Sequence, residues 1–264
     1  MTSTLLANAL VLLISILALW RLSVKLKDVS IVDIFWGLGF VIVSWVSLAV
    51  SFALSQDFAP RRWLLCTLVT VWGFRLAAHL WQRNHGKGED YRYQSIRKRV
   101  GPSFWWSSFF IVFGLQGLLI WLISLPLQVA QADARPFELT WLDYFGLLVW
   151  IVGFAFEALG DDQLKRFKAN PQNKGKVMDQ GLWHYTRHPN YFGDALQWWG
   201  LWLIALNTPY GLMTIFSPFL MTLLLLKISG VSLLEKTLTK TKPGYESYMR
   251  RTNAFLPWPP KSEQ

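Results

Sequence analysis

The amino-acid sequence predicts an all-α integral membrane protein with about seven transmembrane helices, its N-terminus outside and its C-terminus cytoplasmic. The first observation is composition: 53 % of the residues are hydrophobic, sixteen are Trp, and the mean hydropathy is positive. The second is that apolar stretches of bilayer-spanning length recur along the chain. The third is that basic residues gather in alternate loops, which indicates a fixed orientation.

Seven apolar stretches account for the predicted helices, and a spanning helix needs about 20 residues. They lie near 4–22, 31–54, 63–82, 104–127, 139–160, 192–206 and 210–234, and the sixth is short. The first lacks a basic n-region and a cleavage site, so we interpret it as a retained helix rather than a signal peptide. With no repeat, low-complexity segment or linker, residues 1–264 are expected to form a single transmembrane domain.

Charge sets the predicted orientation and limits the partners. Basic residues concentrate in 21–27, 83–99, 165–187 and 236–261, which places these segments inside. The net charge of +10 is explained by the basic inner loops that set the orientation and by their attraction to anionic lipid, so no nucleic-acid partner is expected. A single Cys66 excludes disulfides and a zinc cluster, and no metal site or obligate protein partner is expected. Compact loops favour a multi-pass protein of a bacterial inner (plasma) membrane.

The segment GLWHYTRHPNYFGDALQWWG, residues 181–200, is the richest in ligand-binding side chains. If a helix begins at Pro189, then Asn190, Asp194 and Trp198 share one face at i, i+4 and i+8. A carboxylate inside a membrane span needs a partner, a cavity or a ligand. The alternative is that Arg187 and His188 are interfacial anchors and Asn190 caps the helix. We favour a ligand site, because anchoring does not explain why these residues are concentrated here.

An earlier helical segment carries four charged residues on one face, at i, i+4, i+8 and i+11, and this face continues from the predicted membrane span into the basic loop that follows. The residues are Glu157, Asp161, Lys165 and Lys168. One interpretation is a chain of ion pairs within the helix. The other is a ligand stripe, in which the carboxylates accept from ribose hydroxyls or a carboxamide and the lysines meet phosphates.

The N-terminal half holds four further polar side chains within apolar segments. Asp33 is either a helix-start residue or part of a cavity mouth. Arg75 and His79, at i and i+4, either snorkel to the inner interface or meet an anion, for which Asp33 and a cofactor phosphate are both candidates. Gln116 either joins two helices or faces a substrate ketone.

Two cytoplasmic segments carry aromatic and charged residues with open roles. The predicted loop 86–101 alternates Tyr91 and Tyr93 with cations, which suits either an adenine and its phosphates or the membrane surface. Glu235 marks the exit of the last span, and Tyr245 in the tail is either an anchor or part of a lid. The chain has no Gly-x-Gly-x-x-Gly and no P-loop, so membrane helices and inner loops would have to hold any nucleotide.

The segment RHPNYFGD, with Tyr185 just before it, resembles the C-terminal region of the steroid 5α-reductase and sterol reductase superfamily. The whole chain looks like the bacterial membrane branch of that superfamily (DUF1295-like), best from Asp143 to Pro257. The resemblance implies NADPH among the C-terminal helices, with 1–130 on the substrate side and 139–258 binding the cofactor. Pattern and resemblance together predict these cofactor-binding residues: Arg75, His79, Glu157, Asp161, Lys165, Lys168, Tyr185, Arg187, His188, Asn190, Tyr191, Asp194, Trp198, Glu235 and Tyr245.

The residue that polarises the substrate is less clear. The steroid enzymes use a Glu–Tyr pair in their N-terminal helices, whereas this chain has no tyrosine before Tyr91 and holds Trp72 at the aligned place. Asp33, Arg75 and Gln116 are therefore the catalytic candidates. The implied activity is NADPH-dependent reduction of a C=C bond conjugated to a ketone, such as 5α-reduction of a 3-oxo-Δ4 steroid or a similar lipid enone.

Two other functions stay open. Isoprenylcysteine carboxyl methyltransferases, which use S-adenosylmethionine, carry a related RHP-x-Y-x-G segment. Those enzymes also have an arginine followed by two glutamates on the last helix, and here that region reads KISGVSLLEK, with Glu235 alone. The third possibility is a non-enzymatic lipid-binding or scaffold protein.

Overall fold

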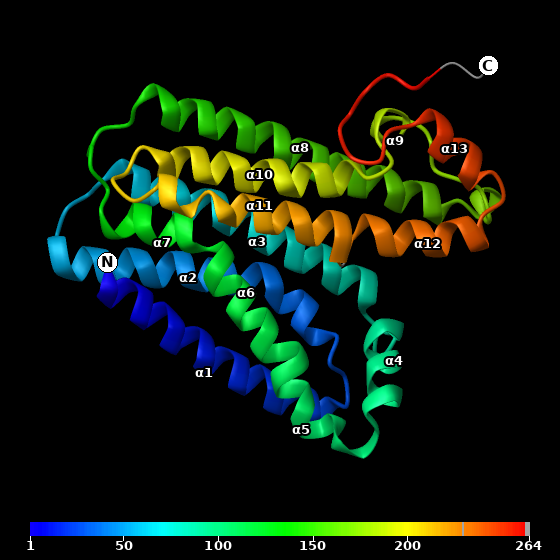
Figure 1. The fold of residues 1–264 in the computed structure, drawn as a ribbon, viewed down its shortest axis with the longest axis horizontal. Helices are drawn as coiled ribbons and strands as arrows, with labels where there is room; N and C mark the ends of the chain where they lie inside the picture. Colours follow the sequence, from blue (N-terminus) through cyan, green and yellow to red (C-terminus); the bar gives the residue numbers. More distant parts are fainter. Residues whose placement is uncertain (229, 262–264) are drawn as a thin grey trace. The chain divides into compact units, whose positions relative to one another are not determined.

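The computed structural model describes residues 1–228 and 230–261, and every regular element in those ranges is a helix (Figure 1). Within these ranges, five helical segments are long and apolar enough to cross a membrane, so the chain is a multi-pass, lipid-embedded protein. They are α1 (Thr2–Leu26), α2 (Ile31–Ser55), α3 (Pro60–Asn84), the composite segment Tyr91–Ile123 and α8 (Trp141–Ala169). A shorter apolar helical segment covers Leu212–Ile228. The count of seven and the orientation of the termini stay predictions.

The chain divides into two compact units. Unit 1 comprises 1–140 and 204–214, and unit 2 comprises 141–203 and 215–264. The composite segment and its continuation contain α4 (Tyr91–Val100), η1 (Gly101–Ser103), α5 (Phe104–Ser108), η2 (Phe109–Gly114), α6 (Leu115–Ile123) and α7 (Leu125–Ala132). The elements after α8 are η3 (Pro171–Asn173), α9 (Leu182–Tyr185), α10 (Pro189–Leu206), η4 (Leu212–Thr214), α11 (Phe216–Leu223), η5 (Leu224–Ile228), α12 (Val231–Thr241) and α13 (Tyr245–Arg251).

In unit 1, a glycine pair lets α2 and α3 touch through their backbones. A Cβ added at Gly37 would lie 2.7 Å from the Gly73 carbonyl oxygen, so neither position tolerates a side chain. Buried amides and hydroxyls join other helices: Asn8 donates to Ser47 at 2.7 Å and to Gln128 at 3.1 Å. Small residues and interhelical hydrogen bonds stabilise this unit, as expected where lipid removes most of the hydrophobic drive between helices.

The segment 86–101 differs from the predicted loop, because most of it is α4. Asp90 caps the helix by accepting a hydrogen bond from the backbone N–H of Arg92 at 2.9 Å. Helix α4 places Tyr93 in an apolar cluster that includes Val32 and Phe113. The sequence left two roles open for Tyr93, cofactor binding and membrane-surface anchoring, and its burial in this cluster is at odds with the second.

In unit 2, glycines seven residues apart bring α8 and α10 into backbone contact (Figure 1). A Cβ added at Gly193 would lie 2.4 Å from the Gly153 carbonyl oxygen, and one at Gly200 would lie 2.7 Å from that of Gly146. Along the same contact, Gly160 meets the ring of Pro189. The polar side chains of the two helices are thereby held at hydrogen-bonding distance.

Candidate functional site

Two pairs of an acid and an amide join α8 to α10 inside unit 2. The Nδ2 atom of Asn190 donates to Asp161 Oδ1 at 2.9 Å, and Gln197 Nε2 donates to Glu157 Oε2 at 2.6 Å. Glu157 and Asp161 are 3 % and 7 % exposed, so the pairs lie out of solvent. These acids reach across to α10, whereas the exposed Asp162 forms the i, i+4 ion pair, with Arg166 at 2.8 Å.

Each amide of these pairs keeps an acceptor available. The carbonyl oxygens Asn190 Oδ1 and Gln197 Oε1 are buried and have no hydrogen-bond partner among the described residues. An unsatisfied buried acceptor costs about 1–3 kcal/mol, so such atoms call for an explanation. A ligand with N–H or O–H donors would satisfy both.

Helix α10 begins at Pro189, as predicted, and aligns three predicted residues on one face. Asp194 is 8 % exposed and Trp198 is fully buried, while Asn190 is half-buried at the helix start. Gln197, which the sequence analysis did not single out, lies beside this face. Its signal was an amide in an apolar helix three residues after Asp194.

Arg187, His188 and Glu235 form one cluster. Arg187 Nε lies 2.7 Å from Glu235 Oε1, and His188 Nε2 lies 3.1 Å from the same oxygen. The His188 ring stacks on Tyr191 with centroids 5.6 Å apart. Arg187 also donates to the carbonyl oxygens of Met249, at 3.0 Å, and Thr252.

The ionisation of this cluster follows from its contacts. Burial opposes the charged form of Glu235, but hydrogen bonds from His188 and Arg187 outweigh it and lower the pKa of Glu235 to about 2. Burial and the charge of Glu235 raise the pKa of Tyr245 to about 12. At physiological pH, Glu235 is therefore a carboxylate and the nearby Tyr245 is a neutral phenol.

The C-terminal tail is bonded to the segment that precedes α10. The backbone N–H of Arg187 donates to Asn253 O at 2.9 Å, and the Thr186 hydroxyl donates to Phe255 O at 2.8 Å. Trp258 N donates to Tyr185 O at 3.0 Å. The Tyr185 backbone thus holds the tail, while its exposed ring meets the His184 ring edge-on with centroids 5.2 Å apart.

The remaining predicted residues of unit 2 lie toward the exposed ends of its helices. Lys165 and Lys168 are exposed near the C-terminal end of α8.

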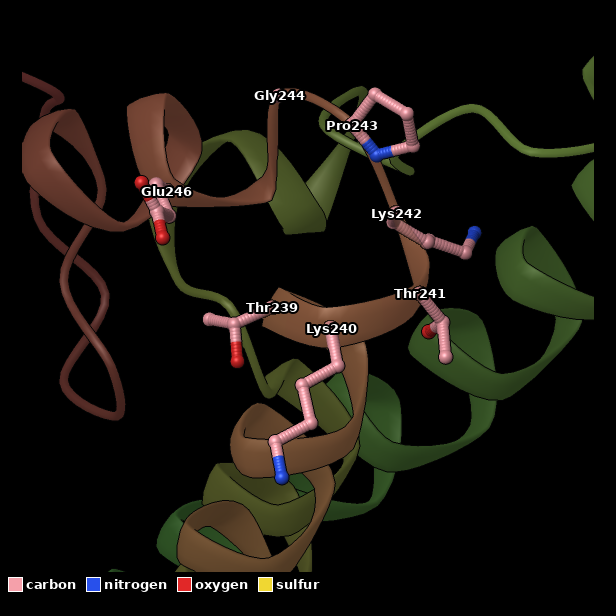
Figure 2. A pocket seen from close by; sticks show the side chains of 7 residues that line it. All are labelled: Thr239, Lys240, Thr241, Lys242, Pro243, Gly244 and Glu246. Carbon is pink, nitrogen blue, oxygen red and sulfur yellow. The ribbon is translucent and has the colours of Figure 1, made fainter.

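A recess of about 420 Å³ lies at the turn between α12 and α13 and is lined by Thr239, Lys240, Thr241, Lys242, Pro243, Gly244 and Glu246. Figure 2 shows Lys240 and Lys242 pointing in different directions, so this recess does not present converging cations.

Unit 1 contains a second polar centre, formed by residues from three helices. Asp33, in the first turn of α2, accepts a hydrogen bond from the Tyr93 hydroxyl at 2.5 Å and pairs with Arg92 at 2.7 Å. Gln116 Nε2, on α6, donates to the Tyr93 hydroxyl oxygen at 3.2 Å. The structure thus brings together two of the catalytic candidates, Asp33 and Gln116, around Tyr93, which was not among those candidates.

The third catalytic candidate lies on another helix of unit 1. Arg75 and His79 are half-buried on α3. Asp33, one of the anions considered for Arg75, is bonded instead to Arg92 and Tyr93 of α4. Among the described residues, no group of His, Cys, Asp and Glu side chains is arranged to hold a metal ion.

The comparisons with known proteins identify the family. Residues 19–252 match the family described as "Protein of unknown function (DUF1295)". The chain belongs to this family. The family is related to steroid 5α-reductase-like proteins.

Two curated proteins are similar to this member of the family. An uncharacterized protein of Schizosaccharomyces pombe is 26 % identical over 267 residues, which cover 90 % of this chain and 75 % of the relative. A probable O-methyltransferase of Ustilaginoidea virens is 37 % identical over 67 residues, 25 % of this chain and 24 % of that protein. No solved structure matches the chain.

Proposed function

We propose that this chain is an NADPH-dependent membrane reductase acting on a C=C bond conjugated to a ketone in a lipid-like enone, for example a 3-oxo-Δ4 steroid. The observation that carries the proposal is the pair of acid–amide contacts between α8 and α10, with buried acceptors left over on Asn190 and Gln197. The proposed location is a bacterial inner membrane.

The side chains of unit 2 fit NADPH. The oxygens of Asn190 and Gln197 suit donors such as a carboxamide NH₂ or ribose hydroxyls, and the acids Glu157 and Asp161 orient these amides. The exposed Lys165 and Lys168 suit phosphates. Bound NADPH would supply the hydride that adds to the β-carbon of the enone.

Arg187 has a different proposed role from the one that the sequence suggested. Its guanidinium is already bonded to Glu235 and to two carbonyl oxygens near the end of α13. We assign it to holding the tail against the segment before α10. Glu235 and His188 complete this support, so the three residues position the cofactor site rather than contact a phosphate.

Tyr93 is the proposed donor to the substrate ketone. In the present structure its hydroxyl donates to Asp33. An enone oxygen would replace Asp33 as the acceptor, while Arg92 continues to compensate the Asp33 charge. Gln116, which donates to the phenol oxygen, would make the hydroxyl a stronger donor. The donor would stabilise the negative charge that develops on oxygen as hydride adds, and a proton from water or a side chain would complete the reduction at the α-carbon.

The alternative is transfer of a methyl group from S-adenosylmethionine. It is supported by the partial similarity to a probable O-methyltransferase. Against it, α12 holds Glu235 as its single glutamate, and that carboxylate is bonded to Arg187 and His188. We therefore keep methyl transfer as the second candidate.

Cofactor binding to the detergent-purified chain tests the proposal. Asp161→Asn should weaken NADPH binding about 10- to 100-fold, because a charge-assisted hydrogen bond contributes about 1.5–3 kcal/mol. Asp162→Asn is the matched control, since Asp162 is the next residue of α8 and pairs outward with Arg166. Its affinity should stay within about twofold of wild type. Selective binding of S-adenosylmethionine would favour the alternative, and equal effects of the two substitutions would remove Asp161 from the site.

A further inference from the structure

Two cations and two tryptophans surround a recess of about 470 Å³ at the C-terminal end of α1, and its lining residues are Trp20, Arg21, Val24, Lys25 and Trp105. We propose that this recess binds the headgroup phosphate of an anionic phospholipid. The inference does not depend on the proposed reductase activity, because the recess lies within unit 1 and shares no residue with either polar centre.

The aromatic walls of the recess are fixed by contacts within unit 1. Trp20 Nε1 donates to the carbonyl oxygen of Trp105 at 3.1 Å. The Trp20 ring also meets the Phe109 ring edge-on, with centroids 5.5 Å apart. Trp105 keeps 57 % of its surface exposed. Tryptophans with one face packed and one exposed are typical of the boundary between headgroups and acyl chains.

The two cations of the recess, Arg21 and Lys25, differ from other cations of unit 1 in their pairing. Arg21 and Lys25 lie one turn apart on α1, both are exposed, and neither forms an ion pair with an acid among the described residues. By contrast, Arg92 and Arg97 of the same unit are paired with Asp33 and Glu89 at 2.7 Å each. A phosphate diester complements the first pair, since a guanidinium binds two of its oxygens and an ammonium adds a point charge.

The surface beside the recess suits acyl chains. Helix α1 is apolar over its spanning length and leaves most of that length exposed. Leu13, Leu17 and Leu22 are among its exposed side chains. A ligand with a phosphate in the recess and hydrocarbon along α1 would match both chemistries. This combination describes a phospholipid rather than a free phosphate.

The test is a lipid titration of the detergent-purified full chain, monitored by its thermal transition. The added ligands are phosphatidylglycerol, phosphatidylcholine and inorganic phosphate. A ligand that binds the folded state raises the transition temperature according to its concentration and affinity. Phosphatidylglycerol should raise it at concentrations where the other two do not.

Variants locate the effect. Arg21→Ala/Lys25→Ala should weaken the apparent affinity for phosphatidylglycerol about 25-fold, since each cation near the surface contributes roughly fivefold. Lys98→Ala/Arg99→Ala removes the same charge from exposed positions on α4 and should change it less than twofold. Lys25→Ala alone should cost about fivefold, which keeps the test valid if the double variant does not fold.

Three results would overturn the inference. Equal shifts with phosphatidylcholine would remove the requirement for an anionic headgroup. Equal losses in the two double variants would indicate diffuse surface charge rather than a site. A shift with inorganic phosphate alone would make the ligand a free anion. None of these three results depends on whether Asp161→Asn weakens NADPH binding, so the lipid site and the proposed reductase function can fail separately.

Discussion

The two polar centres differ in which hydrogen-bonding groups they offer. In unit 2, the acids of α8 are occupied by the amides of α10, and the groups left over are carbonyl acceptors on Asn190 and Gln197. In unit 1, Asp33 is compensated by Arg92, and the group that can be offered is the hydroxyl donor of Tyr93. Reduction of an enone needs both kinds of group, because the cofactor carries donors and the ketone is an acceptor. In the proposed reductase, the acceptors of unit 2 therefore suit the cofactor and the donor of unit 1 suits the ketone.

The largest expected effect comes from breaking the contact that holds the unit 2 centre together. Gly193→Val places side-chain atoms where a Cβ alone would lie 2.4 Å from the Glu157 backbone nitrogen. Because the backbone of α8 at Glu157 cannot move aside as a side chain could, α8 and α10 must separate and the acid–amide pairs must break. We expect loss of NADPH binding and of most folded protein, measured by size-exclusion chromatography and a cofactor titration.

Gly117→Ala is the control for the glycine substitution. A Cβ at Gly117 would meet only the Ile16 side chain, at 3.0 Å, and that side chain can shift. This variant should fold and bind NADPH like wild type. A well-folded Gly193→Val protein with wild-type affinity would show that close approach of α8 and α10 is not what forms the site.

The second-largest effect is expected on the stability of the C-terminal tail, residues 245–258. Arg187→Met leaves Glu235 with His188 alone and removes the donor to two carbonyl oxygens near the end of α13. Breaking one partner of a buried ion pair costs about 3–5 kcal/mol, so we expect a lower thermal transition and faster proteolysis within 245–258. Arg166→Met, which breaks an exposed pair, should cost about 0–1 kcal/mol. Matching losses in the two variants would contradict the supporting role of Arg187.

Tyr93→Phe isolates the unit 1 centre. It removes only the hydroxyl, so the rate of enone reduction should fall about 100- to 1,000-fold, as for loss of one donor to a developing oxyanion. NADPH affinity should not change, because the cofactor is assigned to the other unit. Tyr91→Phe, two residues earlier and 58 % exposed, should keep the full rate. Full activity in Tyr93→Phe would return the role of donor to Arg75 or Gln116.

The smallest effect is a dependence on pH. The pKa of Glu235 is about 2 in the folded protein against an ordinary 4.5, so its carboxylate stabilises the fold above about pH 4.5. That contribution is lost as the pH falls toward 2. The thermal transitions of wild type and Glu235→Gln should therefore differ equally at pH 7 and pH 5, and converge below about pH 4.5. A constant difference down to pH 3 would show that ionisation of Glu235 is not what stabilises the tail.

What the sequence could predict follows from how far apart the interacting residues lie along the chain. The face of α10 with Asn190 and Asp194 was predictable, because helical spacing alone defines it. The repeat of Gly146 and Gly153 on α8, matched by Gly200 and Gly193 on α10, is also visible in the sequence. It is what places the two helices in contact.

The unit 1 centre was not predictable in this way. Asp33, Tyr93 and Gln116 come from α2, α4 and α6, and no local period connects them. Because 86–101 was interpreted as a loop, Tyr93 was expected to bind a cofactor or to anchor at the membrane surface, and not to pack within a helix. The Asp90 cap is the local signal that would have indicated α4.

The most direct test of the proposed reductase activity is isotope transfer from labelled cofactor to substrate. The detergent-purified chain is incubated with NADPH deuterated at C4 of the nicotinamide, using both stereoisomers, and with a 3-oxo-Δ4 steroid. Mass spectrometry then locates the label in the product. We predict one deuterium at the carbon β to the ketone, from one cofactor stereoisomer only. An unlabelled substrate recovered intact, together with methyl transfer from S-adenosylmethionine to a carboxylate or hydroxyl acceptor, would contradict the reductase assignment.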